Sequence, residues 1–180
     1  MEAVKDLSAL RGIVFMGMVG ALSSLLAGVA PAWAVEPGRT FGDWQTECET
    51  PADGKPRCFL SQTRVVENKE SKQATRILKV SVGYFAPDGK GVMVVILPLG
   101  VDLRAGAVLI IDDGKPMPLT YQQCLQDGCL ANAPMDEATL TALRRSKGAQ
   151  ITVRPYGGAQ RVAFPISTKG VTDGLAALKP

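Results

Sequence analysis

The stretch Gln122-Gln-Cys-Leu-Gln-Asp-Gly-Cys-Leu-Ala-Asn-Ala-Pro134 decides how the middle of this chain is organised. Its cysteines, Cys124 and Cys129, enclose the pair Asp127-Gly128, a turn signal that lets a chain reverse with a residue at positive φ. The pattern predicts a hairpin closed by a local disulfide. A redox pair is the alternative, but four residues separate these cysteines, whereas the thioredoxin-type motif has two.

The N-terminus has the features of a secretory leader. A run without charged residues, Gly12–Val29, follows a short polar start and precedes Ala32-Trp33-Ala34, a small-x-small cleavage site. We therefore expect a signal peptide over residues 1–34 and one exported domain over residues 35–180. An uncleaved anchor is the alternative, because the run approaches the length that spans a bilayer, about 17 to 25 residues. The glycines and the Ala-x-Ala exit favour cleavage.

All four cysteines lie in the part expected to be exported, and an even number in an oxidising compartment predicts two disulfides. We expect Cys48 to pair with Cys58 and Cys124 with Cys129, because each pair brackets turn residues. Other pairings are possible in principle. A structural zinc site is a further alternative, but the spacing does not match zinc knuckles and export disfavours it.

Alternating and apolar runs predict a mainly β, antiparallel, β-sandwich-like single domain with one or two short α-helices. The strongest hairpin signal is the segment 87–91, which joins Ile77–Phe85 to Val92–Leu99. Residues 92–97 are apolar on both faces, which indicates a central strand. Further strands are expected at residues 44–48, 57–66, 107–111, 117–123, 149–155 and 160–166, and helices at 136–147, capped by Asp136, and within 168–178, capped by Thr172.

The loop Leu99–Gly106 is the candidate interaction site. It places Leu99, Val101 and Leu103 at every second position and also carries Arg104. These apolar side chains either plug the end of the sandwich or form a ligand-binding lip. As a hypothesis, the binding surface includes Val101, Leu103 and Arg104 together with the neighbouring disulfide-closed turn.

The sequence contains no histidine, which excludes Ser-His-Asp and Cys-His catalysis and histidine-ligated metals. Gly-rich phosphate loops are absent too. The net charge of +3 is weak and spread along the chain, so we expect no nucleic-acid partner. The adjacent acids Asp112 and Asp113 are interpreted as a solvated turn, because neighbouring residues of a strand point to opposite faces. We therefore predict a protein that is not an enzyme and that has no cofactor or metal.

Several motifs, taken in order, resemble the invasion-associated locus B family of exported bacterial proteins. The resemblance extends from about residue 40 to 178 and rests on Phe41-Gly-Asp-Trp44 with Cys48 and Cys58, Leu97-Pro-Leu-Gly-Val-Asp-Leu103, Gly106, Ile111-Asp-Asp-Gly114, Cys124 with Gly128-Cys129-Leu-Ala131, and the closing segment Ile166–Leu178. One residue departs from the family pattern: Val171 stands where the closing segment usually has an aromatic.

This resemblance implies a β-sandwich-like exported domain, implicated in some pathogens in entry into host cells, and it supplies no catalytic residue. We expect a non-enzymatic interaction protein, periplasmic or secreted to the cell surface, involved in host-cell invasion or an envelope function. Its partner would be an unidentified protein of the envelope or a host surface, with no stable membrane span after leader cleavage. The alternative is a periplasmic envelope enzyme or a redox-assisting factor.

Overall fold

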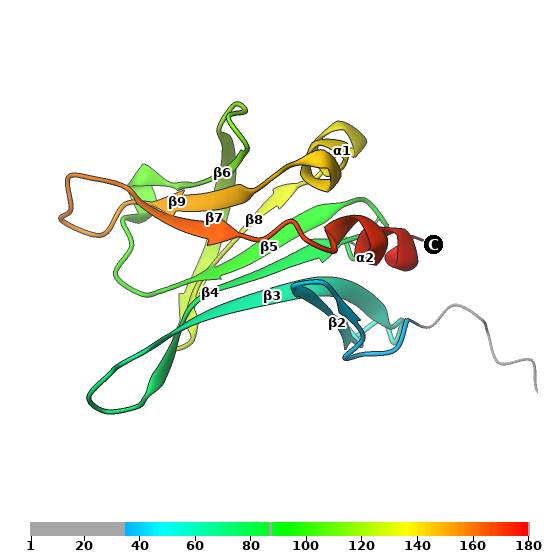
Figure 1. Cartoon of the computed structure of the whole chain (residues 1–180), viewed down its shortest axis with the longest axis horizontal. Helices are drawn as coiled ribbons and strands as arrows, with labels where there is room; N and C mark the ends of the chain where they lie inside the picture. Colours follow the sequence, from blue (N-terminus) through cyan, green and yellow to red (C-terminus); the bar gives the residue numbers. More distant parts are fainter. Residues whose placement is uncertain (1–34, 87, 180) are drawn as a thin grey trace, which may run out of the picture. The chain divides into compact units, whose positions relative to one another are not determined.

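The computed structural model of the chain describes residues 35–86 and 88–179, so the expected signal peptide lies outside the described residues. Strands dominate the described part, and two α-helices lie near its C-terminal end (Figure 1). The elements are β1 Thr40–Phe41, β2 Trp44–Glu49, β3 Arg57–Glu67, β4 Ala74–Gly83, β5 Val92–Leu97, the 3-10 turn η1 Leu103–Ala105, β6 Ala107–Ile111, β7 Met117–Leu125, β8 Gly128–Pro134, α1 Glu137–Arg145, β9 Ala149–Val153, β10 Val162–Ile166 and α2 Val171–Leu178.

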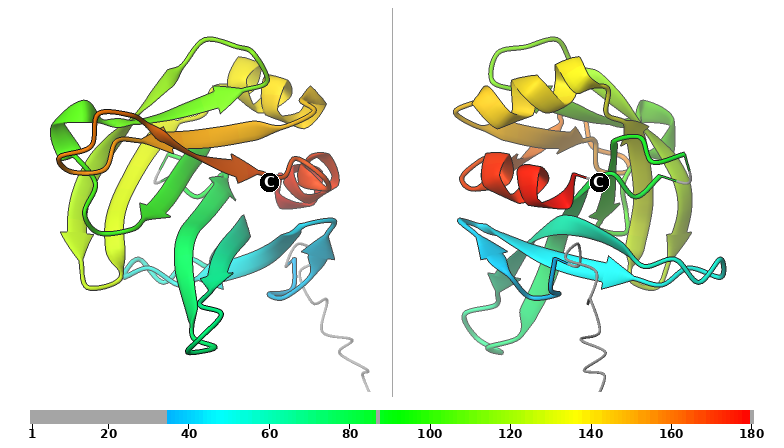
Figure 2. Two further views of the ribbon diagram at one scale, coloured as in Figure 1. Left: turned by 60° about the vertical axis from the view of Figure 1, so that its left-hand side comes forward. Right: turned by 90° about the vertical axis from the view of Figure 1, so that its right-hand side faces the viewer.

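All ten strands belong to one antiparallel sheet in the order β1-β2-β3-β4-β5-β8-β7-β6-β9-β10. The sheet curls because β7 pairs with β6 along its first half and with β8 along its second. Figure 2 shows the two parts of the sheet facing each other with α2 between their ends. The predicted mainly antiparallel β fold is thus confirmed, and a single curled sheet supplies both faces.

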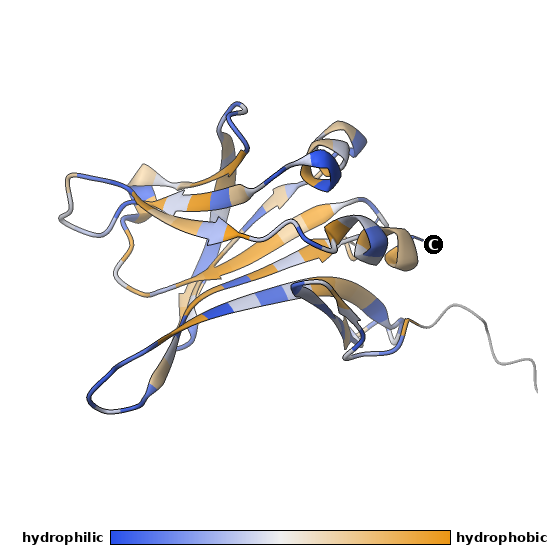
Figure 3. Ribbon diagram, in the orientation of Figure 1, coloured by the Kyte–Doolittle hydropathy of each residue, from blue (hydrophilic) through white to orange (hydrophobic). Residues whose placement is uncertain are grey.

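The apolar core lies inside this curl. Strand β5 was predicted to be central, and it does lie between β4 and β8. Its side chains Met93, Val95 and Leu97 are fully buried, while those on the opposite face are only half-buried. Figure 3 shows mostly hydrophobic residues along β4 and β5 and hydrophilic residues at the tip of the β3–β4 hairpin. The alternation of β5 therefore fixes which face of the sheet is the core face.

Both predicted disulfides are present. Cys48 and Cys58 stand directly opposite each other on β2 and β3, with their Cα atoms 4.0 Å apart. Cys124 and Cys129 occupy the same relation on β7 and β8, with a Cα separation of 3.9 Å. Because each bond joins a cross-strand pair, it locks the register of one hairpin.

The two ends of the sheet meet through a polar contact between the segment 167–170, after β10, and the β1–β2 corner. The indole N–H of Trp44, a side chain that is 1% exposed, donates to the carbonyl of Ser167 over 2.9 Å. The buried Gln62 amide donates to the carbonyl of Asp43 over 3.1 Å and accepts from the Ser167 N–H over 2.9 Å. The backbone N–H of Asp43 donates to the Lys169 carbonyl over 3.1 Å. We call this set of contacts the closing contact.

Helix α2 covers the same corner. Val171 and Leu175 are fully buried, and Gly174 lies so close to β3 that an added Cβ would stand 2.6 Å from the methyl groups of Leu60. The hydroxyl of Thr172 donates to the carbonyl of Arg144 over 3.0 Å, which ties α2 to the end of α1. Thr172 was predicted to cap α2, but the N-cap is Gly170, at φ 90°.

Strand β8 is the second arm of the hairpin predicted at Cys124 and Cys129. No strand range was predicted for Gly128–Pro134, which is rich in residues with low β propensity; it lies between β5 and β7. One other local prediction needs correction. Helix α1 ends at Arg145 with Ser146 as its C-cap, short of the predicted Lys147, whereas the predicted Asp136 cap accepts from the Thr139 N–H over 2.7 Å.

The closing contact predicts that Gly170→Ala is strongly destabilising. An added Cβ would lie 2.0 Å from the carbonyl oxygen of Phe41, and φ is +90°. We expect a loss of about 3 kcal/mol or more in the free energy of unfolding, measured by urea denaturation. Gly54→Ala is the matched control, since φ is +71° with nothing within 4 Å; it should cost about 1 kcal/mol. Equal losses in the two variants would contradict this account of Gly170.

Candidate functional site

The candidate interaction loop between β5 and β6 is held against the end of β9. The N–H of Asp102 donates to the Arg154 carbonyl over 2.7 Å, and the N–H of Tyr156 donates to the Gly100 carbonyl over 2.7 Å. Between these two bonds, Val101 forms an isolated β-bridge with Pro155. The loop therefore has a defined position on the sheet.

Asp102 organises the loop through its side chain. One carboxylate oxygen accepts from the N–H groups of Arg104 and Ala105 over 3.0 and 3.3 Å, as an N-cap of η1. The other accepts from the Arg154 guanidinium over 2.6 Å. That hydrogen bond, helped by the two backbone N–H groups, holds the pKa of Asp102 below its ordinary value, against a smaller opposing effect of burial. Asp102 is therefore a structural anion that fixes the turn.

Arg161 fastens the other side of the loop. Its guanidinium donates to the carbonyls of Ala105 over 2.5 Å and Gly106 over 3.1 Å. Tyr121 on β7 packs against the core, and its hydroxyl has no hydrogen-bond partner among the described residues. Burial raises the pKa of this hydroxyl.

The three predicted interaction residues do not behave alike. Val101 is half-buried and packs against the core, whereas Leu103 and Arg104 are exposed. Leu99 is 57% exposed and Leu103 52%. The idea that the loop plugs the end of the sandwich is therefore right for Val101 and wrong for both leucines. Their spacing of two predicted a common buried face, but the chain leaves the sheet after Leu97 and nothing covers them among the described residues.

The disulfide-closed turn lies beside the start of this loop, as the sequence-based hypothesis required. Leu97 on β5 pairs with Cys129 on β8. Gly128 approaches so closely that an added Cβ would stand 2.3 Å from the Leu97 carbonyl oxygen, at φ +132°. The exposed Leu125 occupies the other side of the same turn. The turn therefore lies next to the end of β5, from which the loop begins.

Large exposed hydrophobic side chains collect at this end of the sheet. We define the loop end as the connections β3–β4, β5–β6, β7–β8 and β9–β10 with their flanking residues, at 64–76, 98–106, 123–129 and 153–162; Figure 1 shows these connections toward the left of the view. Every large hydrophobic residue that is strongly exposed in the described part lies there, with exposed fractions of 44% to 79%: Val65, Val66, Leu99, Leu103, Leu125, Tyr156 and Val162. Single exposed hydrophobic residues are ordinary, but here they are confined to one end of the sheet, which makes the loop end the candidate interaction surface.

The loop end is also the basic part of the domain. It contains seven basic residues, Arg64, Lys69, Lys72, Arg76, Arg104, Arg154 and Arg161, and four acidic ones, Glu67, Glu70, Asp102 and Asp127. The excess equals the net charge of the whole chain, +3. The net positive charge is spread along the sequence, but the fold places it at the loop end.

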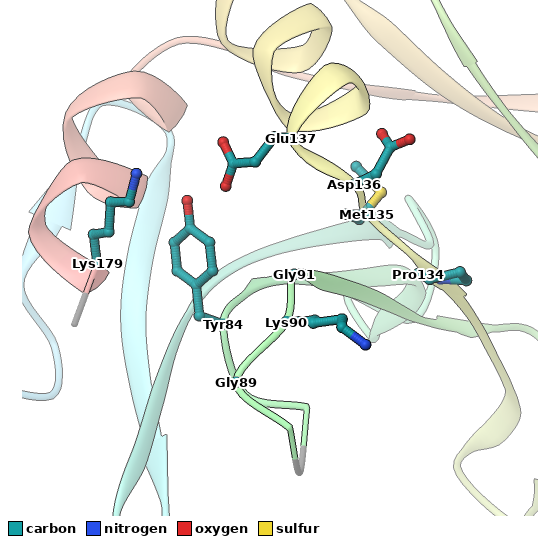
Figure 4. Close-up of a pocket in the computed structure, with 9 residues that line it drawn as sticks. All are labelled: Tyr84, Gly89, Lys90, Gly91, Pro134, Met135, Asp136, Glu137 and Lys179. Atoms are coloured by element: carbon teal, nitrogen blue, oxygen red, sulfur yellow. The ribbon is translucent and has the colours of Figure 1, made fainter.

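A pocket of about 470 Å³ lies elsewhere, between the β4–β5 connection and the start of α1 (Figure 4). Two of its polar groups have partners: the hydroxyl of Tyr84 accepts from Arg144 over 2.6 Å, and Lys90 pairs with Asp88 over 2.8 Å. The carboxylate of Asp136 caps α1, and this hydrogen bond from Thr139 lowers its pKa, opposite to what a general acid requires. Asp136 therefore serves as a helix cap at this pocket.

The paired acids of the β6–β7 turn border a second pocket, of about 590 Å³. The turn is exposed, as expected, and Asp112 also has a structural role. Its carboxylate accepts from the N–H groups of Lys147 and Gly148 over 2.9 and 3.1 Å. Within residues 35–86 and 88–179, no group of three or more His, Cys, Asp or Glu side chains is placed to hold a metal ion.

Fold and site together define a class: a mainly antiparallel β domain with two local disulfides and an apolar, basic loop surface. The disulfides are typical of proteins that fold outside the cytoplasm. Residues 44–179 match the model of the family described as Invasion associated locus B (IalB) protein. The chain belongs to this family. In the part of the chain that the structure describes, we find no helix with the length and apolar character needed to cross a membrane.

The similar proteins carry invasion in their names. The chain is 35% identical over 157 residues to the Invasion protein B homolog of Brucella abortus strain 2308, and equally to that of biovar 1 strain 9-941, covering 86% of this chain and 87% of each relative. The crystal structure of invasion associated protein B from Bartonella henselae superposes with a TM-score of 0.65 at 22% identity, covering 78% of this chain and 92% of that one. The structural likeness supports the fold.

Acidification should loosen the β5–β6 loop before it unfolds the sheet. Because the pKa of Asp102 is lowered in the folded protein, its contribution to stability is present above the ordinary value of about 3.9 and is lost as the pH falls through the folded-state pKa. We expect the hydrogen-exchange protection of the Leu103–Gly106 amides to fall below about pH 4 while that of β5 persists. In Asp102→Asn this pH dependence should be absent. A native loop with protection independent of pH would contradict the role of Asp102.

Proposed function

We propose that this chain is an exported, non-enzymatic interaction protein whose binding surface is the loop end, including Leu103 and Arg104. The observation that carries the proposal is the confinement of the exposed hydrophobic residues to four connections. The loop is fixed by Asp102, Arg154 and Arg161, so its exposed side chains are presented in a preorganised arrangement, which lowers the entropy cost of binding. Val101 contributes as the packed base of the loop.

The biological role that we propose follows the relatives. The Brucella and Bartonella proteins are named for invasion, and we extend this to a role in host-cell invasion or in the bacterial envelope. The leader pattern of residues 1–34 and the two disulfides support export to the periplasm or the cell surface. The partner is a component of the envelope or of a host surface.

Photo-crosslinking from the loop end tests the placement of the binding surface. A photoreactive residue at Leu99 should yield cross-linked envelope or host-surface material in intact cells, and the added change Leu103→Asp or Arg104→Glu should reduce the yield at least tenfold, because each puts a negative charge on an apolar, basic surface. Lys115→Glu, an exposed site in the β6–β7 turn, is the charge-matched control and should leave the yield unchanged. Equal yields in all variants would overturn the placement.

The alternative, a periplasmic enzyme or redox-assisting factor, predicts an accessible low-pKa thiol. All four cysteines are paired in disulfides. We therefore expect a thiol-alkylating reagent to add no mass to the native protein and to modify all four cysteines only after reduction and unfolding, measured by mass spectrometry. Partial labelling of Cys124 or Cys129 in the native protein from the envelope would favour the redox factor instead.

A further inference from the structure

We propose that the loop end docks on the surface of an anionic lipid bilayer. The inference rests on the proposed function in one respect, that the loop end is the binding surface, and it specifies what this surface contacts. Three features carry it: the separation of the apolar side chains on different loop tips, the basic residues on the same end of the sheet, and the rigid attachment of the loops.

The apolar side chains stand on separate projections and do not line a groove. Leu99 and Leu103 lie on the β5–β6 loop, Leu125 on the β7–β8 turn and Tyr156 on the β9–β10 loop. Tyr156 is 79% exposed and is followed by Gly157 and Gly158, so its ring stands free of neighbours in sequence. Side chains of this kind enter the boundary between headgroups and acyl chains, where a tyrosine ring is favoured.

The basic residues lie on the same end of the sheet, Arg104 on the β5–β6 loop beside Leu103, and Arg64, Lys69 and Lys72 on the β3–β4 hairpin beside Val65 and Val66. Within the described residues, Arg64, Lys69, Lys72 and Arg104 take part in no ion pair, so their charges are free to face anionic headgroups. Clusters of four to eight Lys and Arg residues beside apolar side chains are typical of surfaces that recognise anionic lipids. The net positive charge of the domain is concentrated there, which gives the charge complementarity that the proposal needs.

The tips are fixed relative to one another. The Cys124–Cys129 disulfide closes one turn, and the guanidinium of Arg76 on β4 donates to the carbonyl of Asp127 over 2.8 Å, which joins the β3–β4 hairpin to that turn. Arg161 joins the β9–β10 connection to the end of η1. Several shallow insertions that act together can hold a domain on a bilayer where one alone cannot.

The sequence led us to expect a protein partner, but a lipid surface fits these observations better. Protein interfaces concentrate their binding energy in a packed centre of anchors that fill pockets. The lining of the two pockets described above contains no loop-end residue. Separate apolar tips and basic residues on one end of the sheet match a soft, anionic plane.

Vesicle co-sedimentation tests the proposal. The protein is purified as the producing cells process it, with its N-terminus established by mass spectrometry, and mixed with vesicles of phosphatidylcholine alone or of equimolar phosphatidylcholine and phosphatidylglycerol. We expect binding to the anionic vesicles only, weakened by salt and not displaced by free glycerol phosphate, because acyl-chain contact contributes. Arg104→Gln should weaken binding about fivefold and Leu99→Ala with Leu103→Ala about tenfold or more, whereas Lys115→Gln should have no effect. Far-UV circular dichroism checks that each variant is folded.

The outcomes separate the two proposals. No binding to anionic vesicles, equal binding to neutral ones, or binding unchanged in the loop variants overturns the lipid assignment. If vesicles do not bind while a photoreactive residue at Leu99 still cross-links an acidic protein, the lipid assignment falls and the proposed binding surface stands. If neither readout responds to the loop variants, both fall.

Discussion

The rest of the structure depends on the closing contact, in which the segment after β10 meets the β1–β2 corner. A ten-stranded sheet has two edges, β1 and β10, and open edges are a liability for aggregation and a limit on how much core a sheet can enclose. Here the polar groups at the junction are satisfied by one another: the amide of Gln62 bridges Asp43 and Ser167, and the indole of Trp44 reaches the Ser167 carbonyl. A buried network of this kind stabilises only if every member has a partner. The glycines at the junction allow the backbones to approach.

The two disulfides add a second constraint, on the register of individual hairpins. Each joins directly opposed residues of a hairpin, one at the start of β3 and one at the end of β7. Neither links distant parts of the chain, so their effect on the unfolded state is modest. Their main consequence is register, because a slip of one residue would turn every core side chain of those strands outward. Side chains such as Leu60 and Leu119 then face the core.

Much of the fold was predictable from sequence, because it depends on local patterns. The strong hairpin signal before β5, the alternation of β2, and cysteines that bracket turns all reflect interactions between residues near in the chain. What failed depends on distant contacts. The contact between Gln62 and Ser167 joins residues 105 positions apart, so no local pattern indicates it. The extent of β8 depends on its pairing with β5 as well as β7, and at the cap of α2 Phe41 leaves Gly170 no room for a side chain.

The candidate surface was predictable only in part, for the same reason. The loop 99–106 and the adjacent disulfide turn were identified from local pattern, and the fold does bring them together through the pair Leu97 and Cys129. The contributions of Val65, Tyr156 and Val162 were missed, because in the sequence each resembles an ordinary strand or turn residue. Their proximity arises only because neighbouring strands run in opposite directions, which places these four connections at one end of the sheet. The antiparallel strand order also separates two sets of residues at opposite ends of the sheet. The helices and the closing contact occupy the opposite side and fix the fold, so the loop-end side chains have no structural task that explains their exposure. Exposing apolar side chains to water is unfavourable unless they have a role. Because these side chains lie together with the net positive charge of the domain, we explain their exposure by binding to another surface.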